Sequence, residues 1–219
     1  MRFNNAQKVF EHYYDEISDH GTRQENTLAL YNQGFYIDKP LANMILTPWR
    51  KWSPSYAEKE WEWYLSGNRS VSEIKKIAKT WDNMHNGDDL VNSNYGYQWN
   101  RNDQLNYVVN ELIRNPLSRR AVISIYDGKE HDTYSKDTPC TLSILFSVAD
   151  GKLNMSVVMR SNDLWFGFCN DQYCFSKLQE MVAARLDLKI GWYYHFAHNL
   201  HLYDRHIGKN TVQPSLFTL

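Results

Sequence analysis

The sequence has little that would place the protein in a membrane or in an oxidising compartment. None of its apolar runs approaches the roughly 20 residues that a membrane-spanning helix needs. The first six residues lack the apolar stretch of a secretion signal. The 219 residues include only three cysteines, and this odd number argues against a disulfide framework. We therefore expect a cytoplasmic protein with at least one free thiol.

A large charge imbalance is also missing. The formal net charge is −1 at pH 7, so an anion would have to be held by individually placed arginines. We expect neither a nucleic acid nor a membrane as a partner. We expect no metal either, because the spacing of Cys169 and Cys174 fits no CxxC pair. The histidines between His195 and His206 follow a strand-like alternation that does not bring them together.

What the sequence does contain is the pattern of one α+β domain over residues 1–219. Apolar residues recur at helical spacing in residues 6–18, 56–65, 70–79, 102–114 and 173–185. They alternate or are β-branched, as in strands, in residues 27–37, 121–126, 142–148, 153–157 and 190–203. Asp150-Gly151 predicts a hairpin turn, and residues 85–99 predict a loop. Together these patterns predict a mainly antiparallel sheet flanked by helices.

The stretch from Thr138 to Tyr173 holds the side chains that are best suited to catalysis. A free Cys140 can act as a nucleophile, and a nearby arginine such as Arg160 would favour its thiolate. The plainer alternative is a small buried thiol, which is the commoner fate of cysteine. Asp171 suits two roles, reading a base or capping the helix expected after it.

Several short motifs follow one another along the chain. In the second half they are Asn115-Pro116, Arg119-Arg120, Pro139-Cys140, Arg160-Ser161-Asn162-Asp163, Gly167 and His201-Leu202-Tyr203. The first half adds Arg23 in a polar loop, Glu60 ahead of Trp63-Tyr64-Leu65, Trp81-Asp82 and Tyr95-Gly96. The order of these motifs resembles that of the thymidylate synthase family. The resemblance implies a thymidylate synthase-like α+β fold and a homodimer joined sheet to sheet. It also implies 5,10-methylenetetrahydrofolate as the one-carbon donor.

Three positions depart from the thymidylate synthase pattern. Thr141 stands where that family has His, Met159 where it has Gln, and Asp171 where it has the Asn that reads uracil. The run from Met159 to Asp171 looks instead like the deoxycytidylate hydroxymethylases of bacteriophages, as does Asn92-Ser93-Asn94-Tyr95-Gly96. This second resemblance implies dCMP as the substrate and, for a phage-encoded enzyme, the host cytoplasm as its location.

The resemblance implies a role for each matching residue. Cys140 would add to C6 of the pyrimidine, which makes C5 a nucleophile for the one-carbon unit. A protonated Asp171 would donate to N3 of cytosine and accept from its amino group, and Glu60 would activate the donor and order water. The substrate would be held by Arg23, Arg119, Arg120, Arg160, Ser161, Asn170, Asp171, His201 and Tyr203, with Arg119 and Arg120 reaching into the partner's site. The cofactor would be held by Trp81, Asp163, Gly167 and Leu219.

Plainer alternatives stay open. Arg119 and Arg120 could also be solvent-exposed residues at the start of a strand. Glu60 could be a charge on a helix surface, and Trp81 a core residue. Addition of water to the carbon transferred onto C5 gives 5-hydroxymethyl-dCMP, whereas addition of hydride gives 5-methyl-dCMP. The apolar residues 214–219 resemble the tail that excludes water in thymidylate synthases, which keeps methylation a close second. A dUMP-using enzyme and a non-catalytic nucleotide- or RNA-binding relative are further alternatives.

Overall fold

The computed structural model describes residues 1–85 and 88–210 of the chain. Its centre is a mixed sheet with the strand order β1-β3-β8-β6-β5-β4, to which β2 is joined through β3 and β7 through β8. The strands are β1 (Arg2–Phe3), β2 (Thr22–Gln24), β3 (Thr27–Ile37), β4 (Val122–Ser124), β5 (Thr141–Ala149), β6 (Lys152–Met159), β7 (Asn162–Asp163) and β8 (Lys189–Tyr203). The α+β fold predicted from the sequence is therefore confirmed.

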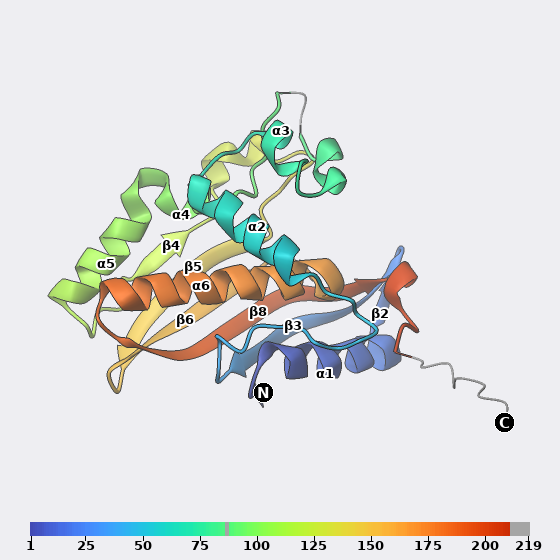
Figure 1. The fold of residues 1–219 in the computed structure, drawn as a ribbon, viewed down its shortest axis with the longest axis horizontal. Coiled ribbons are helices and arrows are strands. Elements are labelled where there is room, and N and C mark those ends of the chain that lie inside the picture. The colour runs from blue at the N-terminus through green and yellow to red at the C-terminus, as the bar shows by residue number, and fades with distance from the viewer. Residues whose placement is uncertain (86–87, 211–219) are drawn as a thin grey trace, which may run out of the picture.

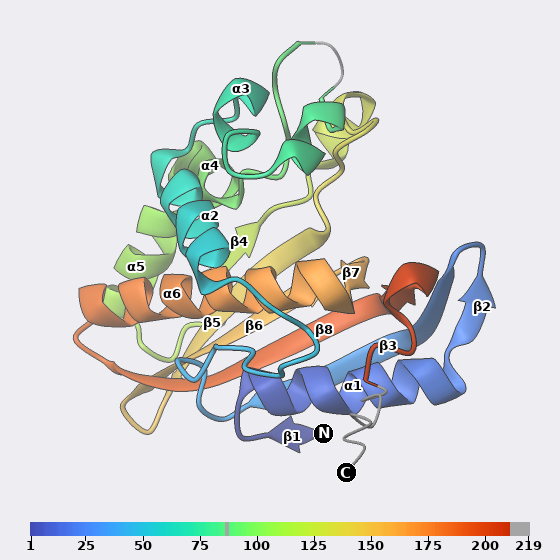
Figure 2. The same ribbon diagram turned by 45° about the vertical axis from the view of Figure 1, so that its right-hand side comes forward.

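The longest helices lie on one side of this sheet. α1 (Ala6–His20) packs against β3, and α6 (Cys169–Arg185) packs against β6 and β8 (Figure 1). α2 (Pro54–Ser66) lies on the outer side of α6, so the helical side is two layers deep there (Figure 2). The shorter helical elements are α3 (Val71–Ile74), η1 (Lys79–Asn83), α4 (Tyr95–Asn100), η2 (Arg101–Asp103), α5 (Gln104–Arg114), η3 (Gly128–Thr133), η4 (Leu164–Phe168) and η5 (Asp204–His206). No helix within residues 1–85 and 88–210 has the length and apolar character needed to cross a membrane.

Local sequence signals explain the ends of several elements. The Ser53 side chain accepts from the backbone N–H of Tyr56 at the start of α2, and Gly67 ends that helix with a φ of 61°. Asp150 and Gly151 join β5 to β6 with φ angles of 51° and 68°, as a two-residue hairpin turn requires. The predicted hairpin is confirmed.

The sheet is antiparallel in most of its pairings, but its centre is parallel. β3 with β8 and β5 with β6 run antiparallel, whereas β6 and β8 run parallel. The chain leaves β6, passes through η4 and α6 and returns as β8, and such a helical crossover makes neighbouring strands parallel. This crossover brings the end of β6 and the start of α6 to the same edge of the fold.

Two of the predicted elements are wrong. The helix expected over residues 70–79 is only α3, and the Ser70 hydroxyl donates to Asp89 instead of capping that helix. The loop expected over residues 85–99 contains the start of α4, whose first turn is capped by the Asn94 side chain. In addition, α5 begins only at Gln104, since the two residues before it have positive φ angles.

Candidate active site

A cleft of about 810 Å³ opens where α2, the loop before β5 and the start of α6 meet. Most of the residues predicted from the sequence line it. They are Glu60, Trp81, Cys140, Arg160, Ser161, Asp163, Gly167, Asn170, Asp171, His201 and Tyr203. They come from α2, η1, the two ends of the β5–β6 hairpin, β7, η4, α6 and β8, so residues far apart in the sequence line one cleft.

The remaining predicted residues do not line this cleft. Arg23 lies exposed on β2 and pairs with Asp204. Arg119 is exposed, and Arg120 pairs with the buried carboxylate of Glu111 at 2.9 Å. Leu219 lies outside the described residues. The roles of these four residues therefore stay predictions.

The β5–β6 hairpin brings Cys140 and Arg160 together. The backbone N–H of Arg160 donates to the carbonyl of Cys140 at 2.9 Å. The guanidinium donates to the carbonyls of Pro139 at 3.0 Å and Thr138 at 2.9 Å, and its Nη2 lies 3.7 Å from Cys140 Sγ. The arginine thus fixes the loop that carries the thiol and leaves one edge of its fork near the sulfur.

The thiol of Cys140 is less acidic than that of a free cysteine. Burial raises its pKa to about 11, although the charge of Arg160 acts in the opposite direction. The charge of Arg160 favours the thiolate, as expected, but it offsets only part of the desolvation in the free protein. The carboxylates of Asp171, Asp137 and Asp163 raise the pKa further. Cys140 is half-buried, whereas Cys169 and Cys174 are fully buried.

Asp171 lies in the first turn of α6, which begins at Cys169 and so earlier than predicted. Its side chain does not cap the helix, and it accepts a hydrogen bond from Asn162 Nδ2 at 2.8 Å. Burial raises the pKa of Asp171 to about 7, and the nearby charge of Asp163 adds to this, whereas the bond from Asn162 opposes it. The carboxyl is therefore partly protonated at neutral pH.

Gly167 leaves the space that this pair of side chains needs. A Cβ at this position would lie 2.8 Å from Asn162 Nδ2 and 3.3 Å from Asp171 Oδ2. Any larger residue would therefore push the amide away from the carboxyl.

Glu60 is a second buried carboxyl in the cleft. Only 5% of it is exposed, so the alternative of a helix-surface charge is wrong. Burial raises its pKa to about 8, and the charge of Asp171 adds to that rise. The hydroxyl of Tyr56 donates to Glu60 Oε1 at 3.1 Å and accepts from Trp81 Nε1 at 3.3 Å. The indole of Trp81 is thereby linked to the carboxyl through one phenol.

Other cleft side chains are held by neighbours. Trp52 Nε1 donates to Asn170 Oδ1 at 2.8 Å. Asp163 accepts from the backbone N–H of Trp165 at 2.8 Å and so caps η4, and burial raises its pKa. The rings of His201 and Tyr203 meet edge to face at 5.3 Å. These contacts fix groups from different elements around one space.

Several cleft residues were missed by the sequence reasoning. Arg50 donates to the carbonyl of Trp165 at 2.9 Å and lies over that indole, and Arg205 lies over Tyr203. The carboxylate of Asp137 accepts from the backbone N–H groups of Asn92 and Ser93, which ties the Cys140 loop to that segment. The Asn92-Ser93 motif was the only available hint of this anchor. Nothing local to Arg50 or Tyr56 indicated a place in the cleft.

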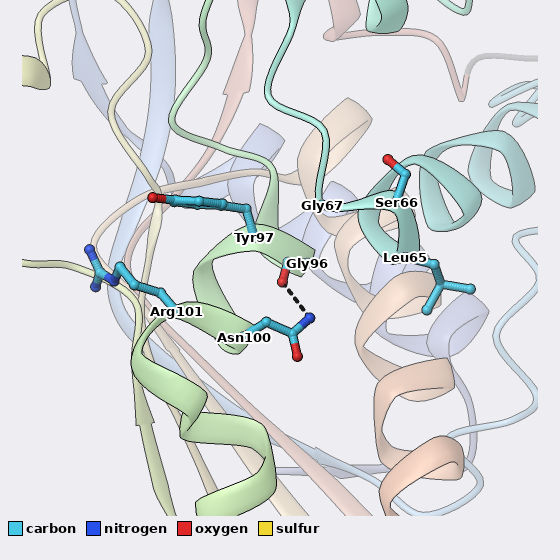
Figure 3. Close-up of a pocket in the computed structure, with 7 residues that line it drawn as sticks. All are labelled: Leu65, Ser66, Gly67, Gly96, Tyr97, Asn100 and Arg101. Atoms are coloured by element: carbon cyan, nitrogen blue, oxygen red, sulfur yellow. Dashed lines mark hydrogen bonds between the residues drawn. The ribbon is translucent and has the colours of Figure 1, made fainter.

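A second and smaller hollow, of about 320 Å³, lies between the ends of α2 and α4 (Figure 3). None of the predicted site residues lines it. Gly96 is needed there because a Cβ would lie 1.5 Å from the carbonyl oxygen of Tyr64. Asn100 donates to the carbonyl of Gly96 at 2.9 Å, and Arg101 reaches away to the carbonyl of Ile125 at 3.1 Å. This hollow is a helix–helix contact rather than a reactive site.

Among residues 1–85 and 88–210, no three His, Cys, Asp or Glu side chains are grouped as metal ligands. His195 is instead fully buried, and His206 stacks on Trp165 with the ring centres 4.7 Å apart. The chemistry that the cleft offers is that of a thiol, several carboxyls whose pKa values are raised by burial, and arginines.

Comparison with known proteins gives one consistent result. A family model described as thymidylate synthase matches residues 5–215. Thymidylate synthase 1 of Bacillus spizizenii is 29% identical over 198 residues, covering 86% of this chain and 70% of the relative. The thymidylate synthase of Bacillus mojavensis is 29% identical over 215 residues, covering 91% and 76%. That of Bacillus phage phi3T is 27% identical over 198 residues, covering 86% and 70%.

Proposed function

The chain belongs to the thymidylate synthase family, and on that premise we propose that it converts dCMP to 5-hydroxymethyl-dCMP. Folate-dependent one-carbon transfer, with 5,10-methylenetetrahydrofolate as the donor, is the reaction class of this family. The choice of cytosine as the base and of a hydroxymethyl group as the product goes beyond family membership.

The observation that carries the proposal is the environment of Asp171. A carboxyl with a pKa of about 7 can be protonated at neutral pH. It can then donate to the unprotonated N3 of cytosine and accept from its amino group. Uracil presents a donor at N3 and an acceptor at O4, so it would leave polar groups mismatched. The bond from Asn162, in place of a helix cap, leaves the carboxyl available to a base.

Covalent activation of the ring is assigned to Cys140. As the Sγ–C6 bond forms, the electrons of the C5–C6 double bond move towards C4 and N3, where Asp171 supplies a proton. C5 then becomes the nucleophilic carbon of an enamine. The thiol is protonated in the free protein, because burial raises its pKa to about 11, so its proton passes to water in the open cleft as the Sγ–C6 bond forms. Arg160, 3.7 Å from Sγ, stabilises the sulfur as it becomes negative.

The cleft also fits the folate donor, since its volume is within the range of roughly 300–1,000 Å³ that is typical of small-molecule sites. When bound, the cofactor supplies the carbon as an electrophile at the oxidation level of formaldehyde. The flat indole of Trp81, the carboxyl of Asp163 and the open backbone at Gly167 are the groups proposed to hold it. Glu60, with its bond from Tyr56, is proposed to order the water that becomes the hydroxyl of the product.

A homodimer joined through the sheets belongs to the same proposal. Trp192, Tyr194 and Phe196 are half-buried on the face of β8 that points away from α6, and the residues between them are buried. Half-exposed aromatic side chains in a row are typical of a protein interface. Phe196→Asp should give a monomer in sedimentation velocity, and Tyr107→Asp, on α5, is the control. A monomeric wild type would overturn this part.

One specific observation favours a second function. The similar proteins found carry the name thymidylate synthase, which points to dUMP as an alternative substrate. Methylation of dCMP is a further alternative, and residues 214–219, on which it depended, lie outside the described residues.

The test is to supply the protein with 5,10-methylenetetrahydrofolate and either dCMP or dUMP, and to identify each product by mass. We expect 5-hydroxymethyl-dCMP, no dihydrofolate absorbance, and release of tritium from C5 of labelled dCMP. Cys140→Ser should abolish all turnover and tritium release. Dihydrofolate together with 5-methyl-dCMP would refute the product, consumption of dUMP alone would refute the base, and no tritium release would favour a binding protein.

A further inference from the structure

A line of buried hydrogen bonds leads from the cleft into the sheet. Asn162 Nδ2 donates to Asp171 Oδ2 at 2.8 Å. His195 Nε2 lies 3.1 Å from Asn162 Oδ1, and the hydroxyl of Tyr193 lies 2.8 Å from His195 Nδ1. At most 2% of Asn162, His195 or Tyr193 is exposed. A carboxyl in the cleft is therefore connected to a phenol that does not reach it.

The direction of these bonds follows from what each group can donate. Burial lowers the pKa of His195 to about 3, so its ring is neutral, with one donor and one acceptor nitrogen. The amide nitrogen of Asn162 faces Asp171, so its oxygen faces His195 and requires a donor. Nε2 of His195 therefore carries the proton, and Nδ1 accepts from the hydroxyl of Tyr193.

The hydroxyl of Tyr193 favours this direction of hydrogen bonding, from Tyr193 to His195 to Asn162, over the reverse direction. In the reverse direction Nδ1 of His195 would donate to the phenol oxygen, and the hydroxyl hydrogen would need another acceptor. Among the described residues the Tyr193 hydroxyl bonds only to His195. A buried donor without an acceptor is costly, so one hydrogen bond separates the two directions.

The direction of the chain determines where Asp171 holds its proton. Oδ2 already accepts from Asn162, and a carbonyl oxygen accepts better than the hydroxyl oxygen of a protonated carboxyl. The proton therefore belongs on Oδ1. With this arrangement Oδ1 donates to N3 of cytosine and Oδ2 accepts from the amino group, whereas uracil would meet a donor with a donor.

We propose that Asn162, His195 and Tyr193 are positioning residues that keep the proton of Asp171 on Oδ1 and so set the preference for cytosine, a role that rests on the proposed function. Their packing holds the arrangement in place. The ring of His195 stacks on Phe35 with centres 5.2 Å apart and meets the edge of Phe168 at 5.4 Å. Gly167 sits against Asn162, which leaves the amide little room to turn.

The first test needs no substrate. The ¹⁵N NMR spectrum of the wild-type protein, with His195 assigned through His195→Gln, should show a neutral ring protonated at Nε2. Protonation at Nδ1 would overturn the proposal whatever the enzyme acts on. This measurement also keeps the proposal testable if a variant fails to fold.

The second test uses Tyr193→Phe, which removes the end of the chain without touching a ligand. The ratio of kcat/KM for dCMP to that for dUMP should fall at least about tenfold, because without the phenol the two directions of hydrogen bonding through His195 and Asn162 become similar in energy. Loss of packing alone would lower both rate constants together and leave the ratio unchanged, which would refute the role. Tyr107→Phe, on a residue that is 45% exposed, should leave the ratio at the wild-type value.

His195 supplies a matched pair of variants. His195→Gln keeps an N–H donor and an acceptor oxygen and should retain most of the dCMP preference, whereas His195→Leu should lose it. Equal ratios in the two variants would count against the chain. Failure of the proposed function itself is distinguishable, because it would appear as wild-type turnover of dUMP only, or of neither nucleotide, with the His195 tautomer unaffected.

Discussion

Replacing Asp171 with Asn should stabilise the protein, and the gain should grow as the pH rises. The Asp171 carboxyl is held in a buried environment next to Asn162, where its charged form is poorly solvated. An amide has no charged form and is nearly the same size. The stability difference between the two proteins therefore reports the cost of ionising this one buried group.

The magnitude follows from the pKa. Burial raises the pKa of Asp171 from 3.8 to about 7, so the folded state binds the proton more tightly than the unfolded chain. The stabilising contribution is fully present below pH 3.8 and is lost as the pH rises through 7. At 1.36 kcal/mol per pKa unit the whole loss is about 4 kcal/mol, of which roughly 2–3 kcal/mol falls between pH 5 and pH 8.

The assay is urea unfolding of the wild type and Asp171→Asn at pH 5 and pH 8, at a fixed protein concentration. The stability gained by the substitution should be larger at pH 8 by roughly 2–3 kcal/mol. Asp132→Asn, on an exposed residue, should change stability by less than about 0.5 kcal/mol at either pH. A gain that does not change with pH, or that shrinks as the pH rises, would refute the burial argument.

Four further predictions concern the cleft. Alkylation of Cys140 by iodoacetamide should quicken about tenfold per pH unit from pH 7 to 9.5, since burial raises its pKa to about 11, and a plateau below pH 8 would contradict this. Arg160→Gln should slow the same reaction at least about tenfold at each pH, because a charge 3.7 Å from the sulfur is lost. Gly167→Ala should cut kcat/KM for dCMP at least about tenfold with a small change in Tm, and unchanged kinetics would show that the space is not needed. Tyr56→Phe should lower kcat by about 10- to 100-fold with KM little changed, because Glu60 loses a hydrogen bond, and a rise in KM alone would place the phenol in ground-state binding.

Most of the fold could be predicted because its signals are local. The alternation along β8 and the turn at Asp150-Gly151 depend only on neighbouring residues. The failures involve distant partners. Asp89 takes the Ser70 hydroxyl away from its capping position, and α4 packs so closely on α2 that only a glycine fits at Gly96. No pattern within either segment contains that information.

The candidate site divides in the same way. Motif order was enough to place most of the predicted residues in the cleft, but not to predict that Arg23, Arg119 and Arg120 lie outside it. The bond from Asn162 to Asp171 depends on how β7 meets α6, and the link from Tyr56 to Glu60 depends on how one side of α2 faces the cleft. The pKa of Cys140 depends on burial, which no motif expresses. The sequence therefore predicted many of the residues that line the cleft, but not their protonation states.

Stability and base recognition make opposite demands on Asp171. At neutral pH an Asn here would remove a buried charge, so selection for stability alone would favour the amide. Only a carboxylic acid can both present a hydrogen-bond donor to N3 and give up that proton as the ring is activated. The charge of Asp171 also helps to raise the pKa of Glu60 to about 8, so pairing of a protonated Asp171 with cytosine would ease ionisation of Glu60. Under the proposed function, the free energy of unfolding that Asp171→Asn gains is therefore the stability that the protein gives up to recognise cytosine.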